Sequence, residues 1–524
     1  MVVVVVAAAM LVGCGGGGAS YEKAVSKSAI AVARLDANQV LQKSGIYEEL
    51  LRLTRAKMLS EDMPSELVAI AEDPQNLGID VEAPVYGFVE AKGGNVFYVA
   101  AVAKMGQRAK LDGILACLER LSEGDVKRLV VDGVTFVEIE RNVAFAYNDV
   151  AVMLGGVVAD NSYGNNVELY LSESLSQALK GKGGELPGFD DCDAAVRVNM
   201  EHLFAVADSE LAKLNDSEAA QAIAQLEPYR DMKIDMALNF ANGSIDLNTK
   251  VINMPDMGIN YKPCSNDNLQ YVAAKAWAVL NGHLVGEDVV KAIDKALEEY
   301  PALKKELDKE LRSATGGMMN TTGVMAIAEP LIKSVDGDVT VALNNIMMDG
   351  KRLADIDAVA VVNVKNRAIF DQVSGLLAAS DGVERVNGDT YSANLDGVTA
   401  LFGQNGDLLY ASLSKPLAPQ MKPATEAEWY PAIKGSYGYA VINLDQILSN
   451  YTLKDELARS LRREFGRQGG GYVAKWMDSV SYILYNASDV DSVSFSVVLK
   501  NKERNSLQQM VDVVKFDIIR DMLR

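Results

Sequence analysis

Cys14 is the residue whose surroundings most clearly indicate chemistry. It follows the apolar run VVVVVAAAMLV at residues 2–12 and one glycine, and four further glycines come directly after it. The run is too short to span a bilayer, which needs about 20 residues, but it fits the apolar core of a secretory signal peptide. A small residue before a cleavage site and a free thiol after it would allow the signal to be removed and the sulfur to be acylated.

The tetrapeptide Leu11-Val12-Gly13-Cys14 resembles the lipobox of bacterial lipoproteins. The resemblance implies that residues 1–13 are a signal peptide and that Cys14 becomes acylated after cleavage. Residues 14–27 would then be a lipid-anchored flexible tether, because glycines follow the cysteine. No Lys or Arg precedes Lys23, so the basic start of a signal peptide is missing and we expect the true start codon to lie upstream. The alternative is a chance cysteine behind a valine run.

The residues after Cys14 bear on localisation. No Asp follows the cysteine, which in the enterobacterial sorting rule favours the outer membrane. No acidic cluster follows it either, and such a cluster marks surface export in Bacteroidetes lipoproteins. We therefore expect a cell-envelope protein on the outer membrane that faces the periplasm.

Catalytic groups are sparse. The two histidines, His202 and His283, lie in no HExxH motif and in no paired Cys/His spacing, so a zinc site is unsupported and both are expected to be structural or at the surface. No G-x-S-x-G motif is present. Ser412 and Lys415 have S-x-x-K spacing, but they end an expected strand, whereas penicillin-binding enzymes carry this motif on a helix. We predict no catalytic activity, no catalytic residue, no cofactor and no metal.

Three further stretches could bind ligands. Asp190–Asp193 gathers carboxylates but lacks the order of a calcium loop, so a solvated linker is favoured. The glycines of LKGKGGELPG are not followed by the Lys-Ser/Thr of a phosphate-binding loop, and this stretch is also read as a linker. Trp429-Tyr430-Pro431 could be an aromatic platform for glycan, although packing within a loop is favoured.

The other cysteines give little sign of a disulfide framework. If Cys14 is acylated, an odd number remains: Cys117, Cys192 and Cys264. Cys117 lies on the apolar face of an expected helix and is predicted to be a buried, inert thiol. A Cys192–Cys264 disulfide is conceivable but not favoured.

Composition defines the broad class. The chain has 524 residues, 49% of them hydrophobic, which is enough for a large core in two to four domains. The net charge of -20 is spread along the chain and disfavours nucleic acid and anionic lipid headgroups as partners.

The sequence repeats itself. Gln107–Leu121 recurs as Asn366–Ser380, and each expected helix follows a strand-like run, VFYVAAVAK in the first copy and DAVAVVNVK in the second. Val131–Leu154 recurs as Val386–Leu413, each predicted to be a meander of three strands with Asn, Asp and Gly in its turns. A third unit, a strand followed by a helix, recurs more loosely. In its copy at Ala29–Leu41, Asp36 and Gln39 are expected to cap the helix.

Two strands alternate apolar and polar residues, which predicts one buried face. The apolar positions are Ile234, Met236, Leu238 and Phe240 in the first strand, and Val493, Phe495, Val497 and Leu499 in the second. The repeated blocks keep their order, so we predict two tandem similar domains at 28–270 and 271–524. Each is expected to be α+β, an antiparallel sheet that contains a meander, with helices packed on one face. A helical pair broken at Pro301 and a last helix near Ser506–Arg524 complete the prediction.

The signal, the lipobox, the strand beginning AVARLD and two similar halves resemble a family of Bacteroidetes lipoproteins of the outer membrane or periplasm, described only as a domain of unknown function. This resemblance implies no activity and no catalytic residues.

We therefore predict a membrane-anchored, non-catalytic lipoprotein that acts as a binding or scaffolding module in the cell envelope. Its partners would be the membrane, through the lipid on Cys14, and an unknown protein or apolar ligand, but no nucleic acid. Three alternatives stay open: a periplasmic carrier of apolar ligands such as lipids or lipoproteins, a surface glycan-binding accessory, and, least favoured, a hydrolase with an unrecognised site.

Overall fold

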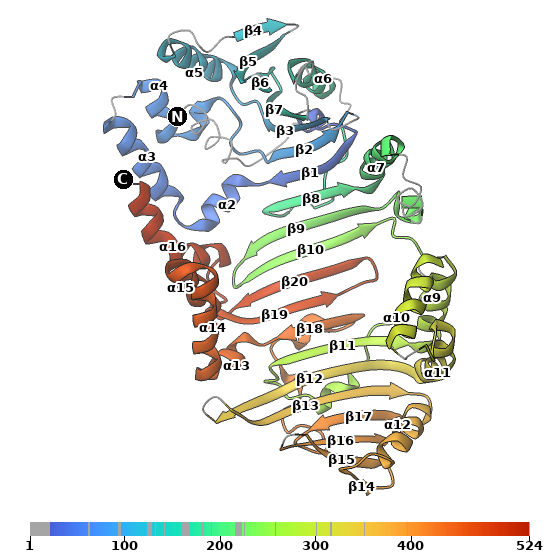
Figure 1. Ribbon diagram of the computed structural model, residues 1–524. Coiled ribbons are helices and arrows are strands. Elements are labelled where there is room, and N and C mark those ends of the chain that lie inside the picture. The colour runs from blue at the N-terminus through green and yellow to red at the C-terminus, as the bar shows by residue number, and fades with distance from the viewer. Residues whose placement is uncertain are drawn as a thin grey trace. The chain divides into compact units, whose positions relative to one another are not determined.

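The computed structural model describes residues 21–522, apart from 61–62, 93–95, 123–127, 132, 141, 160–166, 180–182, 190, 215–222, 225, 257, 300, 315–316, 350–351 and 396. The chain divides into two compact units (Figure 1). Unit 1 comprises Met1–Pro255 and Asn501–Arg524, and unit 2 comprises Asp256–Lys500.

Unit 1 contains an antiparallel sheet in the order β4-β5-β6-β7-β3-β2-β1-β8-β9-β10. The strands are β1 (Ala29–Leu35), β2 (Val85–Ala91), β3 (Val96–Lys104), β4 (Arg128–Val131), β5 (Val134–Glu140), β6 (Val143–Tyr147), β7 (Ala151–Ala159), β8 (Ala194–Asn199), β9 (Lys233–Ala241) and β10 (Ser244–Ile252). The helices, with 3-10 turns written η, are η1 (Tyr21–Ala24), α2 (Ala37–Ser44), α3 (Tyr47–Ser60), α4 (Ser65–Glu72), η2 (Pro74–Leu77), α5 (Arg108–Leu121), α6 (Val167–Leu179), α7 (Met200–Leu214), η3 (Glu227–Tyr229) and α16 (Ser506–Met522).

Unit 2 contains an antiparallel sheet in the order β14-β15-β16-β17-β13-β12-β11-β18-β19-β20. The strands are β11 (Ala278–Val285), β12 (Val335–Asp349), β13 (Arg352–Val364), β14 (Val383–Asn387), β15 (Thr390–Leu395), β16 (Val398–Asn405), β17 (Leu408–Leu413), β18 (Gly438–Ile442), β19 (Val480–Ala487) and β20 (Ser492–Leu499). The helices are η4 (Asp267–Tyr271), α9 (Gly286–Glu299), α10 (Pro301–Ala314), α11 (Thr321–Ser334), α12 (Ala368–Ala378), η5 (Ala424–Glu426), η6 (Tyr430–Ile433), α13 (Leu444–Ser449), α14 (Tyr451–Glu464) and α15 (Gly466–Met477).

Within the described residues, the strand order of unit 1 becomes that of unit 2 when ten is added to each strand number. The predicted α+β class and the antiparallel meanders are confirmed, as β5–β7 and β15–β17. Gly406 forms the turn between β16 and β17 at a φ of 62°, a value that glycine adopts without strain. Asp36 caps α2 as predicted, since its Oδ1 accepts from the Gln39 backbone N–H at 3.1 Å.

The bounds of the units differ from those predicted for the domains. The last helix, α16, belongs to unit 1, because the Asn505 side-chain amide donates to the Phe240 carbonyl oxygen at 2.6 Å and α16 packs against α2. Residues 256–270 belong to unit 2, where Leu269 is buried in the core.

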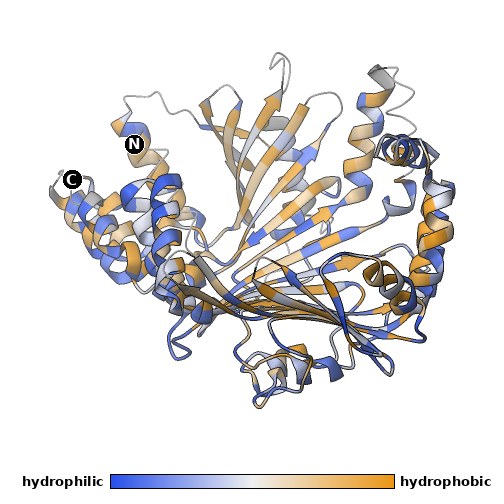
Figure 2. Ribbon diagram, turned by 60° about the horizontal axis from the view of Figure 1, so that its bottom comes forward, coloured by the Kyte–Doolittle hydropathy of each residue, from blue (hydrophilic) through white to orange (hydrophobic). Residues whose placement is uncertain are grey.

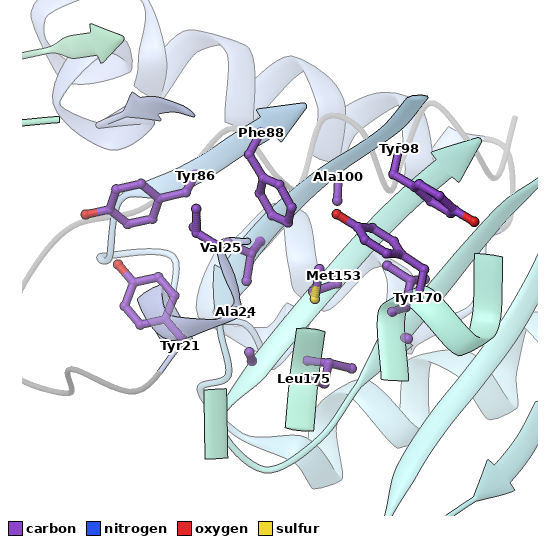
Figure 3. Close-up of a cluster of buried hydrophobic side chains, with 14 of the residues drawn as sticks. Tyr21, Ala24, Val25, Tyr86, Phe88, Tyr98, Ala100, Met153, Tyr170 and Leu175 are labelled. Carbon is purple, nitrogen blue, oxygen red and sulfur yellow. The ribbon is translucent and has the colours of Figure 1, made fainter. Parts of the chain in front are cut away.

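The main core of unit 1 lies between one face of the sheet, η1 and α6 (Figure 3). Tyr98 of β3 stacks on Tyr170 of α6 with ring centroids 4.1 Å apart. Tyr21, Ala24 and Val25 are buried in this core. The predicted tether therefore cannot extend to residue 27, because the apolar side chains of its last residues are part of the fold.

Helices pack on both faces of the sheet in unit 1, although on one face they cover only one end, so the prediction of helices on a single face is wrong. The side chains of Ala100 and Val102 in β3 pack towards α6, whereas Ala103 packs with Leu111 and Leu115 of α5 in a second core. Since successive side chains of a strand point to opposite faces, α5 and α6 lie on opposite sides. None of the helices in the described residues is long and apolar enough to cross a membrane.

Candidate functional site

Cys14, the one residue to which the sequence assigns a chemical role, lies outside the described residues, together with residues 1–13 and the first part of the tether. The candidate site within the described part of the chain is therefore a surface rather than a catalytic centre.

The strands carry many hydrophobic residues (Figure 2), and on the face of the unit 1 sheet opposite η1 and α6 apolar side chains remain exposed. α5 covers one end of it, over β5–β7. Beyond α5, Val99 of β3 is 44% exposed and Ala33 of β1 is also exposed. Soluble proteins rarely leave a wide apolar area uncovered unless it binds something.

A groove of about 520 Å³ lies on this open face. Its position follows from cross-strand pairing, which aligns one row of side chains across five strands: Leu154, Ala101, Gly87, Ala33 and Val196. The neighbouring row is bulkier at its centre, where Val99 pairs with Val89. The three small residues of the first row, in β3, β2 and β1, therefore form a floor below the valines.

Strand β9 shows how the open face differs from the prediction. Ile234, Met236, Leu238 and Phe240 do share one face, but all four are only partly buried. The buried residues of the strand are Asp235 and Ala237 on the other face. Arg197 of β8 neutralises Asp235 through a bidentate pair with both N···O distances at 2.6 Å, so a charge is accepted on the core side.

Unit 2 has an apolar open face of the same kind. Leu280 of β11, 57% exposed, pairs with Val341 of β12, and across the sheet Tyr485 of β19 pairs with Phe495 of β20. All four side chains are exposed. The prediction for β20 is correct for Val497 and Leu499, which are buried, and wrong for Phe495.

The opposite face of unit 2 carries a cleft of about 990 Å³, where the β17–β18 connection crosses the sheet. Charged residues of both signs line it, among them Asp357, Lys415 and Asp445. Asp357 pairs with Lys415 and accepts from the Asn344 amide at 3.1 Å, and Asp445 pairs with Lys500 at 2.6 Å. These carboxylates are occupied by intramolecular partners.

Ser412 and Lys415 lie at this cleft but do not form a nucleophile–base pair. The Ser412 hydroxyl donates to the Lys415 backbone carbonyl at 2.7 Å, while the Lys415 ammonium pairs with Asp357. Ser412 is in strand β17, as predicted.

The two histidines lie in different units. His202 Nε2 is 2.9 Å from the Lys27 carbonyl oxygen, and His283 Nδ1 is 3.3 Å from Asp338 Oδ1. Asp338 also accepts from the backbone N–H of Ser265 and Asn266, so it organises the chain that enters unit 2. No cluster of metal-binding side chains occurs in the described part of the chain.

The prediction of a solvated linker at Asp190–Asp193 is wrong for Asp193. It is fully buried, pairs with Lys43 at 2.7 Å and accepts from the Phe240 backbone N–H at 2.6 Å. It therefore ties α2 to β9 and does not face solvent.

Trp429 is 2% exposed and packs in the core of unit 2 beside Tyr439, so it offers no open platform for a sugar. Cys117 is buried as predicted, and Cys192 and Cys264 are free. Burial and the nearby Asp338 raise the pKa of the Cys264 thiol to about 12, which makes it inert at neutral pH.

Sequence reasoning missed the residues of the groove. Apart from Arg34 and Glu90, the strands AIAVARL and VYGFVEA are nearly continuous runs of apolar residues, which usually indicate that both faces are buried. The signal available was the recurrence of Ala and Gly in adjacent strands, which leaves room above the sheet.

Comparisons with known proteins give a family but no activity. No curated protein matches the chain. One solved structure, described as "Structure of crystal form III of TP0453", is 12% identical and covers 46% of this chain and 81% of that chain, with a TM-score of 0.23, too weak a likeness to support an argument. The family described as "Domain of unknown function (DUF4836)" matches residues 21–507, so this chain belongs to that family.

Proposed function

We propose that this chain is a non-catalytic binding protein of the cell envelope, held at the periplasmic side of the outer membrane by acylated Cys14, whose sheets present apolar faces to a ligand or partner. The observation that carries the proposal is the open apolar face of unit 1, where Val99 and its neighbours remain accessible in a protein of net charge -20. A ligand or partner that covers this face would bind favourably, because burying apolar area from water contributes about 25 cal/mol per Å².

Two tandem copies of one ancestral unit are part of this proposal. The repeated blocks of sequence and the matching strand order of the two sheets support it. A duplicated unit would give the protein two apolar faces on one anchor.

Binding of Nile red, an uncharged fluorescent dye, tests the open face. We expect the folded full-length Cys14→Ala protein, which cannot carry the lipid, to enhance the dye's fluorescence. Val99→Glu should reduce the enhancement, because a carboxylate on the open face makes the surface polar. Exposed Glu173 of α6 gives a matched control, since Glu173→Gln changes charge away from that face. A folded protein that leaves Nile red dark would contradict the proposed function.

Mass spectrometry of the mature N-terminus tests the anchor. We expect a chain that begins at a diacylated Cys14, and we expect Cys14→Ala to leave the membrane fraction. An unmodified Cys14 that still carries residues 1–13 would contradict the lipoprotein assignment.

A further inference from the structure

We propose that the groove on the open face of unit 1 binds an acyl chain of a lipid molecule taken from the membrane. This inference rests on the proposed function and specifies its ligand. It depends on three features: the shape of the groove, its lack of charge, and the small number of residues between Cys14 and the first buried residue of unit 1.

The shape fits a narrow chain better than a broad protein surface. The floor runs across three strands through Ala101, Gly87 and Ala33, with Leu154 at one end and Val196 at the other. Its volume of about 520 Å³ falls within the range of about 300–1,000 Å³ typical of small-molecule sites. A Cβ added at Gly87 would meet only the Ala100 carbonyl oxygen at 4.0 Å, so the space above this glycine is open.

The absence of charge in the groove also favours a hydrocarbon chain as its ligand. Every residue that lines the groove is Gly, Ala, Val, Leu or Phe, so no ionisable side chain is present. Protein interfaces, in contrast, carry about one hydrogen bond per 100–200 Å² and are anchored by residues such as Arg, Tyr and Trp. Only an occupant without charges along its body matches this floor, and the acidic protein around it keeps an anionic headgroup outside.

The chain ahead of the fold brings unit 1 close to a source of such ligands. Tyr21 is buried in the unit 1 core, and Cys14 precedes it by seven residues. Seven residues span at most about 25 Å when fully extended. An acylated Cys14 therefore holds unit 1 within that distance of the bilayer that contains the lipids.

Lipid uptake by groove-filled variants tests the proposal. Purified full-length protein would be titrated with cis-parinaric acid, a fluorescent fatty acid. In a second arm it would be incubated with phosphatidylethanolamine vesicles, re-isolated, and analysed for bound lipid by mass spectrometry. We expect Gly87→Leu and, independently, Ala33→Leu to weaken parinaric acid binding by at least about tenfold, equivalent to about 1.4 kcal/mol, and to abolish lipid recovery.

Gly113→Leu is the matched control. This glycine is exposed on α5 and an added Cβ would meet no atom within 4 Å, so the same substitution adds the same bulk away from the groove. We expect it to bind as the wild type does. Both groove variants retaining full affinity while folded would overturn the proposal.

Two other outcomes would also overturn it. Uptake by Cys14→Ala but not by the acylated protein would show that the chain's own lipid fills the groove. Nile red binding without uptake of fatty acid or phospholipid would leave the proposed apolar binding function standing and would refute the lipid ligand alone.

Discussion

Unit 1 and unit 2 have the same strand order but cover the core face of the sheet in different ways. In unit 1 the β7–β8 connection contains α6, and Leu171 of this helix packs over Gly155 of β7. In unit 2 the described part of the β17–β18 connection has only the short turns η5 and η6. Trp429 enters the core there, and the cleft of about 990 Å³ lies beside it.

At equivalent strand positions, the size of the side chains differs between the two units according to whether a helix covers the sheet there. The runs VFYVAAVAK and DAVAVVNVK place Ala100 and Val361 at corresponding positions. Ala100 pairs with Gly155, whereas Val361 pairs with Tyr410, a large side chain that packs against the unit 2 core. A glycine allows a helix to approach the sheet closely, and a tyrosine fills that space where no helix is present. One topology therefore accommodates two coverings through a few side chains.

Trp429→Ala should have the largest effect, because it removes the main side chain that replaces a helix in unit 2. We expect a loss of about 3–5 kcal/mol in the free energy of unfolding, measured by urea denaturation. Hydrogen exchange should quicken in β11–β13 and β18–β19. Met421→Ala, in the same connection but fully exposed, should change stability by less than about 0.5 kcal/mol. Faster exchange confined to unit 1 would contradict the comparison.

Leu171→Ala is the counterpart in unit 1. Leu171 is fully buried between α6 and the sheet, so we expect a loss of about 2–5 kcal/mol, with faster exchange in β3 and β7. Exposed Glu173 on the same helix gives the control, and Glu173→Ala should be close to neutral. If Leu171→Ala lost no more stability than Glu173→Ala, this result would show that α6 contributes little to this core.

Gly155→Ala tests the close approach directly. An added Cβ would lie 2.6 Å from Leu171 Cδ2, so we expect a loss of about 1–3 kcal/mol from overpacking. Leu171→Ala should relieve this clash, and the double variant should then be more stable than the sum of the single effects predicts. Additive losses in this double-mutant cycle would place the leucine elsewhere.

The sequence predicts local elements correctly where a few neighbouring residues determine the structure. The Asp36 cap, the break before Pro301 and the turn at Gly406 each depend on neighbouring residues, and each is confirmed. The meanders follow from Asn, Asp and Gly between short apolar runs, and the pairing of β5–β7 shows them. Such features need no knowledge of distant contacts.

The choice of covered face could not be predicted in the same way. Alternation in β9 marks an apolar row at Ile234–Phe240 but does not tell whether a helix, a ligand or solvent lies above it. The core side of that strand holds Asp235, which is tolerated only because Arg197 from β8 pairs with it. Trp429 likewise gives no local sign that it enters the core. The groove depends on the pairing of five strands, which only the folded chain specifies.

The smallest expected effect concerns pH. In unit 1, Arg197 pairs with Asp235 across β8 and β9, whereas the cross-strand neighbours Val441 and Leu484 of β18 and β19 in unit 2 are apolar. A hydrogen bond from Lys233, with Arg197 nearby, lowers the pKa of the Glu185 carboxyl below its usual 4.5. A lowered pKa means that this carboxylate stabilises the fold above pH 4.5 and that the contribution is lost as the pH falls through its lowered value. Because the Glu185 side chain is 61% exposed, we expect this carboxylate to contribute less than about 1 kcal/mol to the free energy of unfolding. Urea unfolding of Glu185→Gln should be compared with that of the wild type at neutral and at acidic pH. We expect the variant to be less stable than the wild type at neutral pH and equally stable in acid. A loss of stability that persists in acid would assign the effect to packing instead of charge.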